Sequence, residues 1–204
     1  MRAEESLVEL AVRRRTADRQ AAAEDEVRRL LDVGLELMRE DPNGNPKIAD
    51  IVRRARVSND AFYRSFRSKD DLMAAIADDG ARRLLEYVRH QRAKTADPAD
   101  QVRACVAGVF KQVTEPEIAR TTRAVVMNIK RADGGTPGVR LRDQIGELIA
   151  ESLAELGSPD PARDGHVAAC AMFGVMEQYL WAERTPDAAD QDHLLDWILR
   201  AARP

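Results

Sequence analysis

The sequence has few of the residues and patterns that mark several common protein classes. Only 4% of its 204 residues are aromatic, and its two cysteines, Cys105 and Cys170, form no CxxC or CxxH pair. Isolated cysteines are typical of reduced thiols, so we expect a cytoplasmic protein without a disulfide framework. No apolar run approaches the roughly 18 residues that a membrane-spanning helix needs. The first twenty residues lack the apolar core of a signal peptide.

The patterns of common catalytic and nucleotide-binding sites are missing as well. The sequence contains no HExxH, no P-loop and no nucleophile elbow. His166 and Cys170 are four residues apart, which can place two metal ligands on one helix face. Because no third ligand accompanies them, we interpret them as a packing pair. We therefore expect no metal, no cofactor and no enzymatic activity.

Helical periodicity is what the sequence does contain. Alternation with a period of two is weak, whereas apolar residues recur three and four positions apart. Proline and glycine divide the chain into about nine predicted helices. The first starts between Thr16 and Ala22, and the others span 46–55, 58–66, 69–92, 98–113, 116–131, 137–156, 160–183 and 187–202. The predicted fold class is all-α.

Capping residues support three of these helix starts. Asn45 is a suitable N-cap with Pro46 at the first helical position. Ser58 is a suitable N-cap for the segment 59–66. Ser68 with Asp71 three residues later has the form of a capping box and opens the long helix 69–92.

The charge of the chain is unevenly distributed. The whole sequence has a net charge of -3. Between Pro46 and Lys69, however, seven basic residues face two acidic ones, which gives this window +5 and leaves -8 for the remainder. A basic patch on an acidic body can bind a polyanion, although a solvated helix face is the more common role of such a run.

The helices 46–55 and 58–66, joined by a short turn, have the pattern of a helix-turn-helix motif. In this motif the second helix enters the major groove of DNA. Phe62 and Phe66 share one side of the second helix and are expected to pack inward. The opposite side presents polar residues that can bond to phosphates or base edges. An ordinary helical hairpin with a polar outer face is the alternative.

Residues 27–72 resemble the DNA-binding domain of TetR/AcrR-family transcriptional regulators. The sequence has IVRRARVS at 51–58 and FYRSFRSKDDL at 62–72, where the family has IAxxAGVS and LYxxFxSKExL at the same spacing. The resemblance implies that Ser58 caps the recognition helix, that Asn59, Asp60 and Arg64 lie where family members contact bases, and that Tyr63 and Lys69 bind phosphates. It further implies that Lys47 lies near the DNA backbone.

Two residues depart from the family pattern. Arg56 replaces the glycine of the turn, so the turn either avoids a positive φ or is strained by about 1 kcal/mol or more. Asp60 replaces the small glycine of the recognition helix. A carboxylate near DNA is unfavourable unless it accepts a hydrogen bond from a cytosine amino group or pairs with Arg64. We favour the pair with Arg64.

We divide the chain into three parts, the last of which the resemblance implies. Residues 1–20 would be a flexible basic arm, in which Arg13, Arg14 and Arg15 either reach the minor groove or make only nonspecific contacts. Residues 21–72 would form the helix-turn-helix domain. Residues 73–204 would form the ligand-binding and dimerisation domain, with the boundary inside the helix 69–92.

The C-terminal part has apolar faces that suit dimerisation and ligand binding. The helix 160–183 carries a stripe of small and apolar residues, and the helix 187–202 has an apolar face, so the two could form a four-helix dimer interface. Alternatively, both faces close the core of the monomer. The candidate ligand-binding residues, each of which could also be plain core, are Phe110, Met127, Met172, Phe173, Met176 and Tyr179.

The resemblance implies a homodimeric repressor that binds a palindromic DNA operator and is released by a small apolar or amphipathic effector. An all-helical enzyme is the second hypothesis, and it predicts catalysis without DNA affinity. An architectural DNA-binding protein is the third, and it predicts DNA binding that no small molecule reverses.

Overall fold

The computed structural model describes residues 6–41, 46–129 and 136–200, and these residues form helices without strands. The helices are α1 (Leu7–Glu40), α2 (Ile48–Ala55), α3 (Asn59–Ser65), α4 (Lys69–Arg92), α5 (Pro98–Thr114), α6 (Pro116–Ile129), α7 (Thr136–Glu155), α8 (Pro161–Ala182) and α9 (Ala188–Arg200). The all-α prediction is confirmed. Eight of the nine predicted segments agree with a helix to within two residues at each end.

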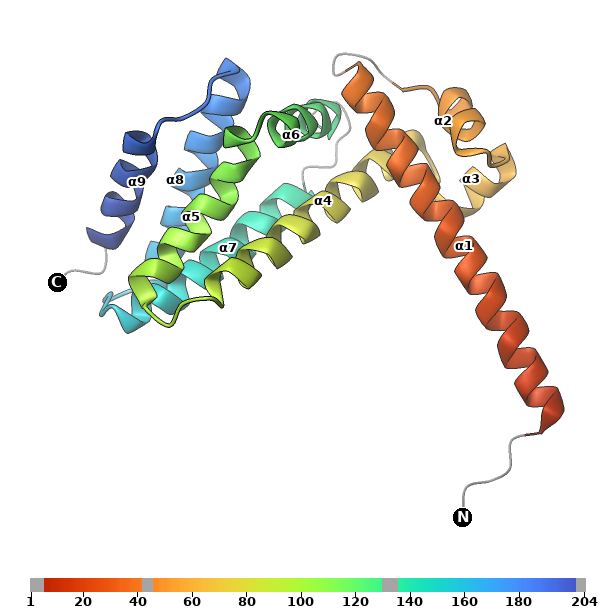
Figure 1. Cartoon of the computed structure of the whole chain (residues 1–204), viewed down its shortest axis with the longest axis horizontal. Coiled ribbons are helices and arrows are strands. Elements are labelled where there is room, and N and C mark those ends of the chain that lie inside the picture. The colour runs from red at the N-terminus through yellow and green to blue at the C-terminus, as the bar shows by residue number, and fades with distance from the viewer. Residues whose placement is uncertain (1–5, 42–45, 130–135, 201–204) are drawn as a thin grey trace.

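The helices are arranged in two groups that share α4 (Figure 1). The helices α2 and α3 lie beside α1 on one side of the molecule, while α5 to α9 lie together on the other side. Each group has its own buried apolar cluster, which we call the N-terminal core and the C-terminal core. From α4, Leu72, Met73 and Ile76 enter the N-terminal core, whereas Leu84, Leu85 and Val88 enter the C-terminal core.

The helix α6 also contributes to both clusters. Its Ala124 is fully buried in the N-terminal core, together with the α1 residues Leu30 and Met38. Val126, two positions later, packs against the C-terminal core. The two groups of helices are therefore joined by α6 as well as by α4.

The first helix begins earlier than predicted. It starts at Leu7, so residues 7–20, which we assigned to a flexible arm, continue α1 as helix. This part of α1 projects away from the other helices (Figure 1). Leu7 is 84% exposed and Val12 is 58% exposed, so these apolar residues of the segment are not buried in the core. Its residues are good helix formers without Gly or Pro, which is sufficient for a helix to continue from a packed segment.

The second helix begins later than predicted. Its N-cap is Lys47, whose carbonyl accepts hydrogen bonds from the amides of Asp50 at 3.0 Å and Ile51 at 3.1 Å. The helix therefore begins at Ile48 and not at Pro46. Asn45, the N-cap we predicted, lies outside the described residues.

Close packing of α7 against α8 depends on two glycines. A Cβ atom added to Gly165 of α8 would lie 2.5 Å from the backbone oxygen of Gly146 of α7. No larger residue fits at this crossing without moving a backbone, which a close-packed interior resists.

Burial also determines the chemistry of one cysteine in the C-terminal core. Cys105 of α5 is fully buried, and this burial raises the pKa of its thiol to about 12. A thiol with such a pKa is unreactive at neutral pH, so Cys105 is a packing residue.

None of the helices in the described part of the chain combines the length and the apolar character needed to cross a membrane.

Candidate functional site

The turn between α2 and α3 closes α2 with a Schellman motif. The Val57 amide donates to the carbonyl of Val52 at 3.1 Å, and the Arg56 amide donates to the carbonyl of Arg53 at 3.3 Å. Arg56 therefore has a left-handed backbone, with φ 55° and ψ 44°. Glycine is the usual residue at this position, and an L-residue there costs roughly 1–2 kcal/mol. Of the two alternatives we stated for Arg56, the structure shows the strained one.

The start of α3 is fixed by the residue predicted to cap it. The Ser58 side chain accepts a hydrogen bond from the Ala61 amide at 3.1 Å. The inner side of α3 then packs into the N-terminal core, where Phe62 is 0% exposed and Phe66 is 8% exposed. The inward direction predicted for both phenylalanines is confirmed.

The outer side of α3 is exposed and polar. Tyr63 is 57% exposed although it is aromatic, and its ring meets Phe62 edge-on with 5.2 Å between the ring centroids. The remaining residues on this side that we predicted to contact DNA are also exposed: Ser58, Asn59, Asp60 and Arg64. An outward tyrosine contributes little to the fold, so its position favours a role in binding.

The predicted pair between Asp60 and Arg64 is not found. The Arg64 guanidinium instead lies 3.8 Å from the carboxylate of Glu26 on α1. None of the ion pairs described for residues 6–41, 46–129 and 136–200 includes Asp60. The prediction failed because it considered only contacts within α3, whereas α1 supplies a competing carboxylate from a distant part of the sequence.

The start of α4 is capped as predicted. The Ser68 side chain accepts from the Asp71 amide at 3.1 Å, and the Asp71 carboxylate accepts from the Arg67 amide at 3.1 Å and from the Arg67 side chain at 3.0 Å. The hydrogen bonds from Arg67 lower the pKa of Asp71. Lys69 is the first residue of α4, so its ammonium group lies near the positive end of the helix dipole, where anions bind.

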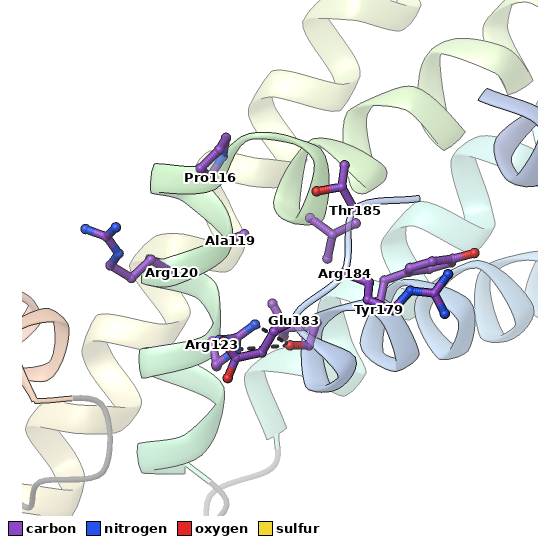
Figure 2. Close-up of a pocket in the computed structure, with 10 residues that line it drawn as sticks. Pro116, Ala119, Arg120, Arg123, Tyr179, Glu183, Arg184 and Thr185 are labelled. Atoms are coloured by element: carbon purple, nitrogen blue, oxygen red, sulfur yellow. Dashed lines mark hydrogen bonds and ion pairs between the residues drawn. The ribbon is translucent and has the colours of Figure 1, made fainter. Parts of the chain in front are cut away.

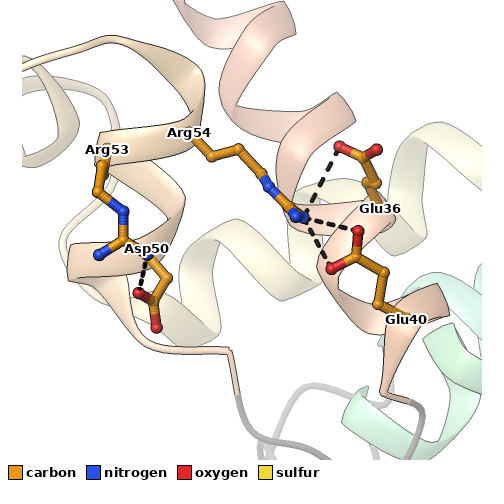
Figure 3. Close-up of polar contacts among 5 residues, drawn as sticks. All are labelled: Glu36, Glu40, Asp50, Arg53 and Arg54. Atoms are coloured by element: carbon orange, nitrogen blue, oxygen red, sulfur yellow. Dashed lines mark hydrogen bonds and ion pairs between the residues drawn. The ribbon is translucent and has the colours of Figure 1, made fainter.

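Other basic residues of this region pair with acids and hold α2 against α1. Figure 3 shows Arg54 of α2 directed at Glu40 and Glu36 of α1, with the closest nitrogen–oxygen distance, to Glu40, at 2.8 Å. The hydrogen bond to Glu40 raises the pKa of Arg54. Within α2, Arg53 lies 2.6 Å from Asp50. The cations left to face a polyanion are therefore fewer than the seven counted in the sequence. Lys47 remains exposed at the start of α2.

Most of the residues predicted to bind a ligand lie in the C-terminal core. Phe110, Met172, Phe173 and Met176 are buried side chains of the C-terminal core. Met127 is half-buried on α6. Tyr179 alone among the six lines a groove that the structure describes.

This groove lies between the first half of α6 and the end of α8 (Figure 2). Its volume is about 260 Å³. The lining residues are Val113, Pro116, Ala119, Arg120, Arg123, Tyr179, Leu180, Glu183, Arg184 and Thr185. We call this feature the α6–α8 groove.

Arg123 spans the α6–α8 groove. Its Nε and Nη2 atoms donate to the carbonyl of Leu180 at 3.0 and 2.7 Å, and its Nη1 lies 2.8 Å from the carboxylate of Glu183. These bonds satisfy a carbonyl at the end of α8 that has no partner within the helix. Nearby, the Tyr179 hydroxyl donates to Asp190 of α9 at 2.5 Å, which raises the pKa of Tyr179 and lowers that of Asp190.

The charged residues of this groove were not predicted from the sequence. Arg120 and Arg123 lie on one predicted helix, whereas Glu183 ends another and Arg184 follows it, about sixty residues further along the chain. Neither segment contains a recognisable motif. Only the packing of α6 against the end of α8 brings them together.

The outer faces of α8 and α9 carry large exposed apolar residues. Val167 is 44% exposed, Trp181 39% and Trp197 42%. On the same side of α8, the sulfur of Cys170 lies 3.6 Å from Nε2 of His166, which agrees with a packing pair. The second ring nitrogen of His166 lies 4.0 Å from Asp143 of α7.

Comparison with known proteins agrees with this architecture. Residues 30–76 match the family model described as "Bacterial regulatory proteins, tetR family". No match to a curated protein sequence was found.

Several solved structures are similar over most of their length. The TetR-family transcriptional regulator SCO4454 from Streptomyces coelicolor is 21% identical, with a TM-score of 0.62, and the match covers 92% of this chain and 96% of that one. The fatty acid degradation regulator FadR from Bacillus halodurans is 15% identical, with a TM-score of 0.63, over 87% of this chain and 96% of that one. RolR in complex with resorcinol is 17% identical, with a TM-score of 0.60, over 91% of this chain and 97% of that one. The chain therefore has the fold of these proteins, with the helix-turn-helix at its N-terminus.

Proposed function

We propose that this chain, a DNA-binding transcriptional regulator of the TetR family and not an enzyme, is a ligand-responsive repressor. It would act in the cytoplasm as a homodimer on a palindromic operator and be released by a small apolar or amphipathic effector. The observation that carries the proposal is the division of α3 into a buried apolar side and an exposed polar side with an outward tyrosine. Residues 21–72 would form the DNA-binding domain, and residues 73–204 the ligand-binding and dimerisation domain.

The DNA-binding residues are proposed by position on the helix-turn-helix. Asn59, Asp60 and Arg64 face outward from α3 and would contact base edges, while Tyr63 would contact the backbone. Lys47, Ser58 and Lys69 stand at the starts of α2, α3 and α4, where backbone amides and cations favour phosphate.

Asp60 receives a more specific role. A carboxylate without a cationic partner on this surface would repel the phosphates of DNA. It is tolerated at the interface if it accepts a hydrogen bond from the amino group of a cytosine. Since Arg64 lies against Glu26, we propose that Asp60 selects cytosine at one position in each half of the operator.

Dimerisation is proposed through α8 and α9. The exposed Val167 and Trp197 would be covered by the same helices of a second copy, because exposed apolar patches of this kind mark interaction surfaces. Gly174 of α8 has no atom within 4 Å of the position of an added Cβ atom, so it leaves room for close approach of another helix. In the dimer, two recognition helices would enter successive major grooves about 34–36 Å apart.

The effector would bind in the C-terminal domain. It would favour a conformation in which the two recognition helices no longer match the spacing of successive major grooves. The residues Phe110, Met127, Met172, Phe173, Met176 and Tyr179 remain candidates for its contacts. One similar structure, RolR, contains bound resorcinol, which supports a small organic effector here. The helix α4 would transmit this change to the DNA-binding domain, because it begins at Lys69 and ends in the C-terminal core. Linkage requires that operator DNA weakens effector binding by the same factor.

The test begins with DNA that flanks the gene of this protein. Fluorescence anisotropy should show tight binding to one palindromic segment, with an affinity that falls linearly with salt on a logarithmic scale. Light scattering should show twice the chain mass of 22.7 kDa. A reporter gene placed behind the bound segment should be transcribed less when the protein is present. A monomer without DNA affinity would refute the proposal.

A further inference from the structure

We infer that the α6–α8 groove is a binding site for a small organic anion, whose carboxylate displaces Glu183 from Arg123. The inference rests on the proposed function in one respect only: the occupant would be the effector. Of the six candidate contacts named above, only Tyr179 lines the groove, and the other five would then be packing residues. It extends that proposal by assigning a site outside the buried core and a charge to the ligand.

The charge of the lining favours an anionic ligand. Three arginines, Arg120, Arg123 and Arg184, line the groove together with one carboxylate, that of Glu183. Two further acids lie nearby: Glu117 pairs with Arg39 and with Arg120 itself, and Asp190 accepts a hydrogen bond from Tyr179. Arg123 and Arg184 are thus left with one carboxylate of the lining, that of Glu183. An excess of guanidinium groups in a concave surface attracts an anion, and the planar guanidinium matches a carboxylate in shape.

The two partners of Arg123 differ in how firmly the structure fixes their positions. The Leu180 carbonyl belongs to α8, so its position is fixed by the helix. Glu183, by contrast, follows the helix, and its side chain is 72% exposed whereas that of Arg123 is only 20% exposed. Its backbone is left-handed, with φ 54°. A ligand carboxylate can therefore replace the Glu183 side chain without leaving the guanidinium unpaired.

Figure 2 shows how the remaining groups are arranged around this pair. Arg123 and Glu183 are joined across the groove, and Arg184 lies beside the Tyr179 ring on the side of α8. Arg184 therefore adds a second positive charge to the lining, on the Tyr179 side of the groove (Figure 2). The apolar side chains of the lining, Val113, Pro116, Ala119 and Leu180, provide contacts for a short hydrocarbon body.

The size of the groove limits the ligand. Ligand sites commonly have volumes of roughly 300–1,000 Å³. At about 260 Å³ the α6–α8 groove lies just below this range, so it suits a single ring or a short chain. The ligand class is thus a small carboxylate with a compact apolar body.

The position of the groove on α6 gives the site a route to the DNA-binding domain. Arg120 in the groove lies 3.5 Å from Glu117, and Glu117 lies 3.2 Å from Arg39 in the last turn of α1. In addition, Ala124 of α6 is buried in the N-terminal core. A shift of α6 on ligand binding would therefore reach α1, against which Arg54 holds α2.

The experiment compares sodium benzoate with benzamide, a neutral molecule of nearly the same shape, by ligand-observed NMR on the full chain. Benzoate should bind, and benzamide should bind at least about tenfold more weakly, because the charge-assisted hydrogen bond is lost. Equal binding of both, or binding of neither, would overturn the inference. Operator affinity is measured separately without either probe, so a failure of DNA binding is recognised independently of the groove.

Three variants locate the site. Glu183→Gln removes the competing carboxylate and should tighten benzoate binding severalfold, whereas Arg184→Gln should weaken it by about tenfold. The control is Arg163→Gln at the start of α8, an arginine that is 81% exposed and should leave benzoate binding unchanged. If Glu183→Gln and Arg184→Gln both behave like the control, benzoate binds elsewhere and the assignment is wrong.

Discussion

The helix-turn-helix and the α6–α8 groove are both polar surfaces on helices, but the chain assembles them in different ways. The exposed residues of the first lie between Lys47 and Lys69, on three successive helices whose opposite sides build one core. The groove combines residues from α5, α6, α8 and the segment after α8, which span positions 113–185. Local surfaces leave a pattern in the sequence, whereas surfaces made by helix packing do not.

The largest expected difference is in the free energy of unfolding of two variants at neighbouring residues of α3. Phe62→Ala removes a fully buried ring and should lower the free energy of unfolding by about 3–5 kcal/mol. Tyr63→Ala removes an exposed ring and should lower it by about 1 kcal/mol or less, while operator affinity falls strongly. Urea denaturation and fluorescence anisotropy measure the two quantities. Similar losses of stability in both variants would contradict the separation of inner and outer sides.

The second test concerns the C-terminal domain, where packing rather than local pattern determines the surface. Gly165→Ala places a methyl group 2.5 Å from the Gly146 backbone oxygen and should lower the free energy of unfolding by about 1–3 kcal/mol. The control on the same helix is Gly174→Ala, where the methyl group meets no neighbour and should raise stability by about 0.5–1 kcal/mol. Because Gly174 lies on the proposed dimer face, sedimentation should accompany the denaturation curves. A neutral Gly165→Ala would show that α7 and α8 can separate easily.

The same contrast explains which predictions from the sequence succeeded. Ser58 and Ser68 were identified as caps because a cap depends on residues two or three positions away, and both caps are present. The direction of Phe62 and Phe66 followed from helical periodicity alone. All-helical architecture and most helix boundaries followed from proline, glycine and apolar spacing in the same way.

The failures involved contacts between distant segments. Arg64 was paired with Asp60 because only its own helix was considered, although Glu26 of α1 lies within reach. The start of α1 was missed because residues 7–20 project away from the other helices (Figure 1), so no packing of their described side chains against a second segment accompanies their helical sequence. The ion pair between Arg123 and Glu183 was not predicted, because neither segment contains a pattern that indicates contact with the other. Their nitrogen and oxygen atoms lie 2.8 Å apart.

The third test asks whether Asp60 belongs to the base-contacting surface. Selection of binding sites from random DNA should give a strong preference for cytosine at one position of each half-site. Asp60→Ala should abolish that preference, a loss of about 1–3 kcal/mol of discrimination, and leave the other positions unchanged. Asp32→Ala, which removes an exposed carboxylate from α1, should leave the selected sequence as it is. If Asp60→Ala instead strengthens binding evenly at all sites, the carboxylate only repels DNA.

The smallest expected effect comes from the two non-glycine residues with a left-handed backbone, one in each region. Arg56→Gly relieves a conformation that costs roughly 1–2 kcal/mol, but the greater freedom of glycine in the unfolded chain offsets about half of that gain. The free energy of unfolding should therefore rise by up to about 1 kcal/mol. Glu183→Gly relieves the same conformation, with φ 54°, yet it also removes the carboxylate that pairs with Arg123, so its gain should be smaller. If Arg56→Gly lowers operator affinity at low salt while stability rises, the arginine contacts a phosphate. In that case Arg56 belongs to the DNA interface, and its strained backbone is compensated by DNA binding. The strained backbone of Glu183 would be compensated in the same way by its role in the groove.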